Sequence, residues 1–299
     1  MSRRFLLAAL ACGTLAQPAP AEVRVRDDAG TEIVLAQPAR RIVSLAPHAT
    51  ELVFAAGAGD RLVGVLAHSD HPPAARALPV IGAAGQIDVE AIVALKPDLV
   101  VTWPWTAPAQ EQRLRAFGIP VMMTLPRAPD DIAGLIERVG ELAGTQDVAA
   151  RAARDFRERM RDLTRRRPPD PPVLVFYQIS GKPMFTLGGD HLVTQAIALC
   201  GGRNVFGALS LPAPEVDVER VVAAQPELIV AGATGGVRPA WLDAWQRWPE
   251  LPAVARGQLV TVDADLMHRP GPRFVEGVAV LCEALERARR ARRPGKGGS

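Results

Sequence analysis

Histidines have the widest chemistry of the side chains in this sequence, because imidazole can bind metal ions and exchange protons near neutral pH. The chain holds five of them, and only the segment His68-Ser69-Asp70-His71 brings two close together. This segment could form a metal site with His268, and its histidines and aspartate could serve a metal-dependent hydrolase. A polar loop lining a pocket has the same composition and is more frequent, so we predict no metal site.

Sequence motifs of the common enzyme classes are missing. There is no G-x-x-x-x-G-K-[ST] phosphate loop, no G-x-S-x-G nucleophile elbow, and no G-x-G-x-x-G after the first predicted strand. Ser180-Gly181-Lys182-Pro183 matches a phosphate loop only in part, because Pro183 would obstruct the helix that must follow. We therefore expect a binding protein without a cofactor and not an enzyme.

The distribution of charge argues against nucleic acid as a partner. The chain has 35 basic and 32 acidic residues, but two of the basic residues lie in 1–21 and six in 287–299. Residues 22–286 therefore hold 27 basic residues against all 32 acidic ones. A nucleic-acid-binding domain carries its basic surface on its folded part. We interpret residues 291–299 as a basic flexible tail.

The N-terminus has the order of features of an export signal. Two arginines precede the apolar run Phe5–Ala11, and Ala19-Pro20-Ala21 offers the small residues that a signal peptidase reads. We predict that residues 1–21 are a signal peptide cleaved near Ala21. Cys12 lies in a segment similar to a lipoprotein cleavage box, so a lipidated form is the alternative.

Strands and helices alternate over most of the chain, which predicts an α/β fold with mostly parallel sheets. Predicted strands cover 41–45, 62–65, 99–102, 121–124, 173–177, 228–230 and 259–262. Predicted helices cover 50–56, 89–95, 107–117, 192–199, 241–248 and 275–290. Residues 130–167 differ, because they read as helix throughout with a single break at Gly144-Thr145.

An internal repeat divides the fold. Residues 87–102 (IDVEAIVALKPDLVVT) match residues 216–231 (VDVERVVAAQPELIVA), with eight of sixteen positions identical. The long helical segment lies between the copies. We predict two similar α/β lobes, 22–143 and 169–290, joined by one long helix over 144–168.

Export changes the interpretation of the cysteines. Removal of the signal leaves Cys200 and Cys282, and an even pair in an oxidising compartment usually forms a disulfide. Two buried free thiols are the alternative.

Several motifs together resemble one family, the periplasmic substrate-binding proteins for cobalamin, haem and iron-siderophores. They are RIVSLAP at 41–47, GAGDRLVGV at 57–65, SDHP at 69–72, CGGRNVF at 200–206 and RPGPR at 269–273. Ser69–Pro73 is similar to the S-D-Y-P-P of the cobalamin-binding branch, and Cys200 and Cys282 resemble its disulfide pair. The resemblance implies a periplasmic, monomeric clamp of two α/β lobes with a rigid interlobe helix and a ligand cleft between the lobes. It also implies that the clamp delivers cobalamin or a related corrinoid to the permease and ATPase of an ABC importer.

The resemblance also implies the ligand contacts. They are Pro47, His48, His68, Trp103, Trp105, Phe185 and Arg269, with Arg269 placed to meet the ligand's amides or phosphate. Ala84 and Ala213 stand where the resemblance leads us to expect tryptophans, and Trp105 could replace one of them. We interpret Trp241, Trp245 and Trp248 as core packing, because their spacing is helical.

Two acids are candidates for docking to the importer. Glu90 and Glu219 occupy equivalent places in the two repeats, and each follows a predicted helix N-cap aspartate by two residues. A favourable interaction with the helix dipole would explain either acid alone. Two acids at equivalent places in two similar lobes would also suit docking to a transporter with two similar halves. Haem binding with His68 or His268 as an axial ligand is the nearest alternative function.

Overall fold

The computed structural model describes residues 22–104, 106–165 and 171–292. Four predicted features lie outside the described residues: the signal peptide with Cys12, the candidate Trp105, the end of the interlobe helix at 166–168, and tail residues 293–299. In the described part of the chain, no helix has the length and apolar character needed to cross a membrane.

The first lobe is built on a four-stranded parallel sheet in the order β4-β3-β7-β8. Its central strands are buried along their whole length, as expected for a parallel sheet covered by helices on both faces. The strands are β3 (Ile42–Ser44), β4 (Leu62–Val65), β7 (Leu99–Thr102) and β8 (Val121–Met123).

The second lobe repeats this topology with the parallel order β10-β9-β11-β12. In each sheet the strand that comes second in sequence lies at the edge, next to the strand that comes first. The third and fourth strands lie on the other side of the first strand, so the strand order reverses at the first strand. The strands are β9 (Val173–Gln178), β10 (Gly202–Asn204), β11 (Leu228–Ala233) and β12 (Leu259–Asp263). The predicted α/β fold with two similar lobes is confirmed.

The repeated segment forms the same unit in each lobe. Asp88 accepts a hydrogen bond from the backbone amide of Ala91 over 2.9 Å and begins α2 (Val89–Ala94). Asp217 accepts one from Arg220 over 2.8 Å and begins α7 (Val218–Ala224). An N-cap aspartate satisfies an amide that the first helical turn leaves free, so these helix starts follow from local sequence.

The other helices agree with the predicted ones except near the tryptophans at 241–248, where a short helix and a 3-10 turn replace one helix. Trp245 is buried there, as predicted, and donates to Gln178. Short hairpins β1 (Val23–Arg26)–β2 (Glu32–Leu35) and β5 (Gly82–Ala83)–β6 (Gln86–Ile87) were not predicted. The remaining smaller helices are α1 (Pro47–Ala55), α3 (Pro108–Ala116), α6 (Leu192–Leu199), α8 (Ala240–Asp243), α9 (Pro252–Ala255) and α10 (Ala264–Met267).

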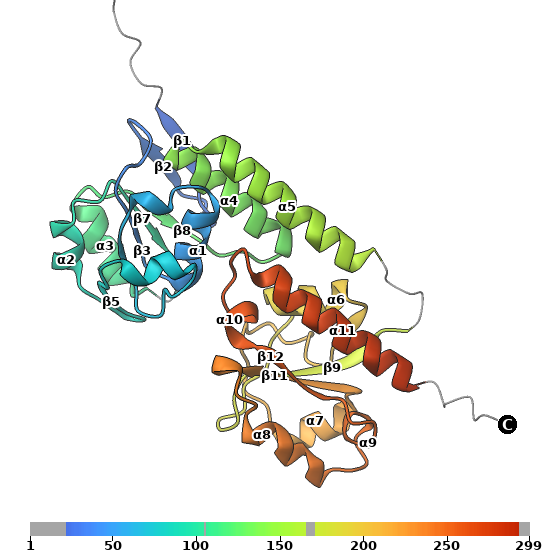
Figure 1. Ribbon diagram of the computed structural model, residues 1–299. Coiled ribbons are helices and arrows are strands. Elements are labelled where there is room, and N and C mark those ends of the chain that lie inside the picture. Colours follow the sequence, from blue (N-terminus) through green and yellow to red (C-terminus); the bar gives the residue numbers. More distant parts are fainter. Residues whose placement is uncertain (1–21, 105, 166–170, 293–299) are drawn as a thin grey trace, which may run out of the picture.

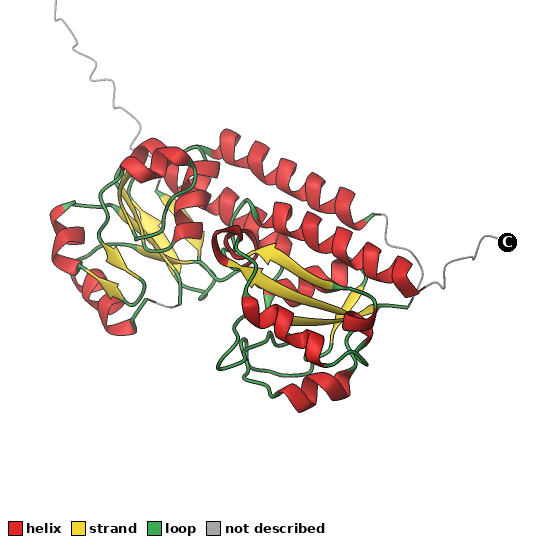
Figure 2. Ribbon diagram, turned by 60° about the horizontal axis from the view of Figure 1, so that its bottom comes forward, coloured by secondary structure: helices red, strands yellow, loops and turns green. Residues whose placement is uncertain are grey.

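Long helices connect the lobes. α4 (Pro129–Ala143) ends at Gly144, which has a left-handed backbone, and α5 (Gln146–Thr164) returns along it. α11 (Phe274–Arg292) of the second lobe contacts α5. Figure 1 shows these three helices along one side of both lobes, and Figure 2 shows the two sheets in separate lobes beside them.

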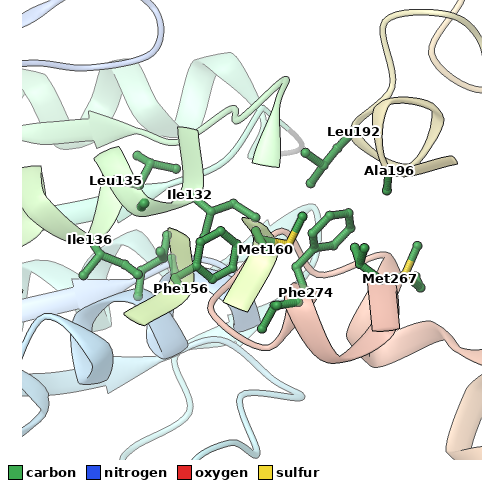
Figure 3. Close-up of a cluster of buried hydrophobic side chains, with 14 of the residues drawn as sticks. Ile132, Leu135, Ile136, Phe156, Met160, Leu192, Ala196, Met267 and Phe274 are labelled. Carbon is green, nitrogen blue, oxygen red and sulfur yellow. The ribbon is translucent and has the colours of Figure 1, made fainter. Parts of the chain in front are cut away.

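An apolar core continues from one lobe into the other beneath these helices. Figure 3 shows Ile132 of α4, Phe156 of α5 and Phe274 of α11 side by side, with Leu192 of α6 close to them. All four belong to one cluster of buried side chains. Lobes joined only by a polar linker would move freely, so this shared core makes the connection stiff.

Cys200 and Cys282 form a disulfide with a Cα–Cα distance of 4.8 Å. It ties the end of α6 to the middle of α11, and it confirms the predicted pairing. The two cysteines are 82 positions apart.

Candidate functional site

A cavity of about 440 Å³ lies between the lobes, and both lobes line it. Its walls are loops that follow the carboxyl ends of strands β7 and β8 in the first lobe and of β9, β10 and β12 in the second. Ligands of open α/β sheets bind at this edge, so the topology itself places a binding site here. The lining residues are Trp103, Pro104, Thr124, Leu125, Pro126, Arg127, Asp190, His191, Leu192, Ser210, Pro212, Met267, His268 and Pro270.

Trp103 lies where this cavity meets a smaller one. The smaller pocket, about 170 Å³, belongs to the first lobe and shares Trp103 as a wall with Pro47 and Ala84. Pro47 is the first residue of α1, where its fixed φ suits a helix start. The structure thus brings two predicted contacts, Pro47 and Trp103, to one surface beside the interlobe cavity.

His48 supports Trp103 from within the lobe. The two ring centroids are 4.6 Å apart, and His48 is fully buried. The hydroxyl of Thr124 donates to the carbonyl of Thr102 and therefore accepts from Nε2 of His48 over 3.0 Å. Burial, with the nearby charge of Arg269, lowers the pKa of His48 to about 3, so a neutral ring supports the tryptophan.

The SDHP motif forms a loop that reaches the other lobe. Buried Ser69 accepts from the hydroxyl of Thr50 over 3.1 Å, and Thr50 also contacts Ser44 of β3. These bonds fix the loop on α1, so that Asp70 meets Nη1 of Arg269 in the second lobe at 2.7 Å.

Arg269 is held by two carboxylates. Besides Asp70, it contacts Asp265 at 2.9 Å, and its side chain is 14% exposed. Burial raises the pKa of Asp70, but the hydrogen bond and charge of Arg269 outweigh it, so the pKa lies below its usual value. The predicted contact of Arg269 with ligand stays a prediction, and in this structure Arg269 joins the lobes.

A second ion pair crosses between the lobes nearby. Arg273 donates from Nε and Nη2 to the two carboxylate oxygens of Glu51, over 3.0 and 2.6 Å. Glu51 lies on α1 and is 3% exposed. The RPGPR motif therefore places two arginines against the first lobe.

His268 packs against the sheet of the second lobe and is partly buried. Its Nε2 lies 3.0 Å from the hydroxyl of buried Tyr177 on β9, and its ring covers Gly232 of β11 so closely that a Cβ there would collide with it. Burial lowers the pKa of His268, so it lines the cavity as a neutral ring.

His191 is a lining residue that the sequence did not indicate as a contact. It is the N-cap of α6, where Nδ1 accepts a hydrogen bond from the amide of Val193 over 3.1 Å. Asn204 of the CGGRNVF motif holds the loop before it by donating to Leu187 and Thr194. Burial lowers the pKa of His191 to about 4, with a contribution from nearby His268.

Opposite charges reach the cavity from the two lobes. Arg127 follows β8 in the first lobe, and Asp190 precedes α6 in the second; both are exposed. Between these polar ends the wall is mostly apolar, with Leu125, Pro126 and Met267 among its residues. An apolar cleft with a few polar groups is the usual form of a small-molecule site.

Other predicted contacts lie apart from the cavity lining. His68 is exposed with a φ of 65°, and Phe185 is partly buried and pairs through its backbone with Glu215. Trp105 lies outside the described residues. Among the described residues, no group of three or more His, Cys, Asp or Glu could hold a metal ion, and Asp70 of the proposed hydrolase triad is engaged by Arg269.

Arg127 could have been found from its place shortly after a predicted parallel strand, because loops at the carboxyl ends of such strands meet ligand. His191 could have been found as the polar residue directly before an apolar helix. Ser210 and Pro212 carry no local signal, since they lie in a loop after a strand that was not predicted.

Glu90 and Glu219 take equivalent exposed positions in the first turns of α2 and α7. Glu90 contacts Arg113 of α3 at 2.6 Å, with 75% of its side chain exposed.

Comparison with known proteins agrees with this geometry. A curated vitamin B12-binding protein of Vibrio cholerae is 38% identical over 254 residues, 85% of this chain and 91% of that protein. The crystal structure of the periplasmic vitamin B12 binding protein BtuF of Vibrio cholerae superposes with a TM-score of 0.77 at 37% identity, over 85% of this chain and 99% of that one. The periplasmic heme-binding protein RhuT of Roseiflexus sp. RS-1 gives a TM-score of 0.70 at 27% identity, over 83% and 99%.

A model of one family matches residues 42–266, which include both four-stranded sheets and helices α4 and α5. The match, together with the two-lobed fold and the cleft at the carboxyl ends of both sheets, assigns the family: this chain is a periplasmic binding protein.

Proposed function

We propose that this protein captures cobalamin or a related corrinoid in the interlobe cleft and delivers it to an ABC importer. The observation that carries the proposal is the 38% identity to a vitamin B12-binding protein over 85% of the chain. The cleft supports it, because both lobes supply its wall and a large ligand could bind between them.

The chemistry of the wall suits a corrinoid. A corrin ring has broad apolar faces and a periphery of amide groups. Trp103, resting on neutral His48, offers an aromatic surface for the ring. Arg127, Asp190 and His191 offer polar groups at the edge of the cleft, where amides and the nucleotide phosphate of the ligand would lie.

The partners in this proposal are the permease and the ATPase of an importer, with Glu90 and Glu219 as docking residues. We propose further that residues 1–21 are a signal peptide removed near Ala21, with lipidation at Cys12 as the alternative. These assignments are supported by the periplasmic family and by the order of residues at the N-terminus. The proposed lobes remain 22–143 and 169–290, with the connection at 144–168.

Calorimetric titration of the mature protein with cyanocobalamin and with haemin tests the proposal. We expect a nanomolar dissociation constant for cyanocobalamin, about −12 kcal/mol, and weaker binding of haemin. Tight binding of haemin with no heat from cyanocobalamin would overturn the corrinoid assignment and leave the fold and the family unaffected.

Haem is the second candidate, because two histidines line the cleft and a heme-binding protein is a structural relative. The geometry of His191 disfavours ligation of iron, because its Nδ1 accepts from the amide of Val193 and the proton of the neutral ring is then on Nε2. Nε2 of His268 faces the hydroxyl of Tyr177, so Nδ1 is the nitrogen of His268 that a haem iron would need. A Soret band in the haemin titration would report binding, and its position would report axial ligation by nitrogen.

A further inference from the structure

The hydrogen bond of His191 to its own helix fixes the position of its proton. A backbone amide can only donate, so Nδ1 of His191 must accept and carry no hydrogen. The proton of a neutral imidazole is then on Nε2. The pKa of about 4 keeps the ring neutral in a periplasm near neutral pH.

Nε2 is the nitrogen that remains for a ligand. The ring lines the interlobe cavity, and among the hydrogen bonds of the described residues none involves Nε2 of His191. Its neighbours in the lining include Asp190, on the same loop, and His268, from the end of α10. The loop is held on its other side by Asn204 and by the bond from Thr194 to Gly188 over 2.7 Å.

We propose that His191 is a specificity residue whose Nε2–H donates a hydrogen bond to an oxygen acceptor on the bound ligand. This inference rests on the proposed function for the ligand, where an amide carbonyl of the corrin periphery or the phosphate of the nucleotide supplies the acceptor. A fixed donor selects for oxygen acceptors and against ligand groups that can only donate, because an unpaired group in a closed cleft loses its hydrogen bond to water. The same geometry excludes His191 as a metal ligand unless the bond to Val193 is given up.

The variant His191→Asn separates this role from helix capping. Asparagine is among the most favourable N-cap residues, so the variant should keep the hydrogen bond to Val193 and the melting temperature. The variant loses the N–H of the imidazole ring. We expect the dissociation constant for cyanocobalamin to rise about tenfold, the effect of one hydrogen bond to a buried acceptor. Asp217→Asn, at the N-cap of α7 and away from the cavity lining, is the matched control and should bind like the wild type.

Titration with cobinamide, which lacks the nucleotide, locates the acceptor. A loss in His191→Asn with both ligands assigns the corrin amides, and a loss with cyanocobalamin alone assigns the phosphate. Equal affinity of His191→Asn and wild type for cyanocobalamin, with intact folding, would overturn the inference. If the wild type binds haemin and not cyanocobalamin, that result overturns the proposed function. The role of His191 is then tested by titrating the same variants with haemin, whose carboxylates are oxygen acceptors.

Nitrogen-15 spectra of the ligand-free protein test the geometry without any ligand. The proton of His191 should be on Nε2. A proton on Nδ1 would contradict the proposal whichever ligand the protein binds.

Discussion

Arg269 of the second lobe donates a hydrogen bond from Nη1 to Oδ1 of Asp70 in the first lobe over 2.7 Å, across 199 positions of sequence. A few residues further on, Arg273 forms the bidentate pair with Glu51. The two pairs lie beside the cleft and join the lobes on the side of α1, in addition to the apolar core beneath α4, α5 and α11. The RPGPR motif therefore ties the second lobe to the first through two ion pairs.

Coupling between Asp70 and Arg269 should be measurable in a double-mutant cycle with Asp70→Asn and Arg269→Gln. We expect a coupling free energy of about 0.5 to 2 kcal/mol, because the side chain of Asp70 is 45% exposed and Arg269 keeps Asp265 as a second partner. The folded-state pKa of Asp70 is lowered, so this stabilisation is complete above its unfolded pKa and is lost as pH falls through the folded value. Urea unfolding at neutral and at acid pH measures it, and a coupling of zero at neutral pH would contradict the tie.

Removal of Arg273 should cost more than removal of Arg269. Arg273→Met would leave the carboxylate of Glu51, 3% exposed, buried without its partner, and such a change costs about 3 to 5 kcal/mol. The double variant Glu51→Leu with Arg273→Met removes both charges and should recover most of that loss. Urea unfolding of the wild type, the single variant and the double variant gives the free energies to compare. A double variant as unstable as the single one would show that packing, not the buried charge, dominates.

Trp103→Ala should weaken cyanocobalamin binding by about 1 to 3 kcal/mol, the range for loss of an aromatic anchor. Trp103→Phe should keep much of the affinity, because a ring would still rest on His48. Phe117→Ala removes an aromatic ring that is 59% exposed at the end of α3 and serves as the control. Calorimetry gives the affinities. Unchanged affinity of a folded Trp103→Ala would assign the residue to packing alone.

The disulfide should stabilise the second lobe without contributing to ligand contacts. Loss of a cross-link spanning 82 positions is expected to lower stability by about 4 to 5 kcal/mol in the chain-entropy model. The variant Cys200→Ser with Cys282→Ser should therefore melt at a lower temperature, while its affinity for cyanocobalamin at a temperature where it is folded stays at the wild-type value. An equal melting temperature for the variant and the wild type would refute the stabilising role.

Charge reversal at both Glu90 and Glu219 should abolish uptake in vesicles reconstituted with the importer, with ligand affinity and melting temperature nearly unchanged. Rim charges of this kind set encounter rate and register, and the exposed pair of Glu90 with Arg113 adds little stability. The control reverses two exposed acids on other helices, Glu141 of α4 and Glu283 of α11. Normal uptake by the Glu90→Arg, Glu219→Arg protein would rule out docking, and a large fall in its melting temperature would favour helix capping as the role.

The sequence alone determined the fold class, the lobes' repeated unit and most strands. These features depend on local physics. Asp88 and Asp217 each accept a hydrogen bond from the backbone amide three positions on and so begin α2 and α7, and Pro97 and Pro226 follow the ends of these helices. The alternation of strands and helices specifies parallel sheets. The pairing of Cys200 with Cys282 was also predicted from the sequence, on the hypothesis that Cys12 is removed with a signal peptide, and the structure forms it.

The composition of the cleft was decided only by tertiary structure. Arg127 and His191 are far apart in the chain and meet at one cavity because the two sheets turn their carboxyl ends toward each other. The resemblance implied a ligand contact for Arg269, which stays a prediction, but it did not indicate the partners Asp70 and Asp265 that the folded chain gives this side chain. An arginine's type predicts that it will be paired, but the identity of its partner depends on which loops the fold brings within hydrogen-bonding distance.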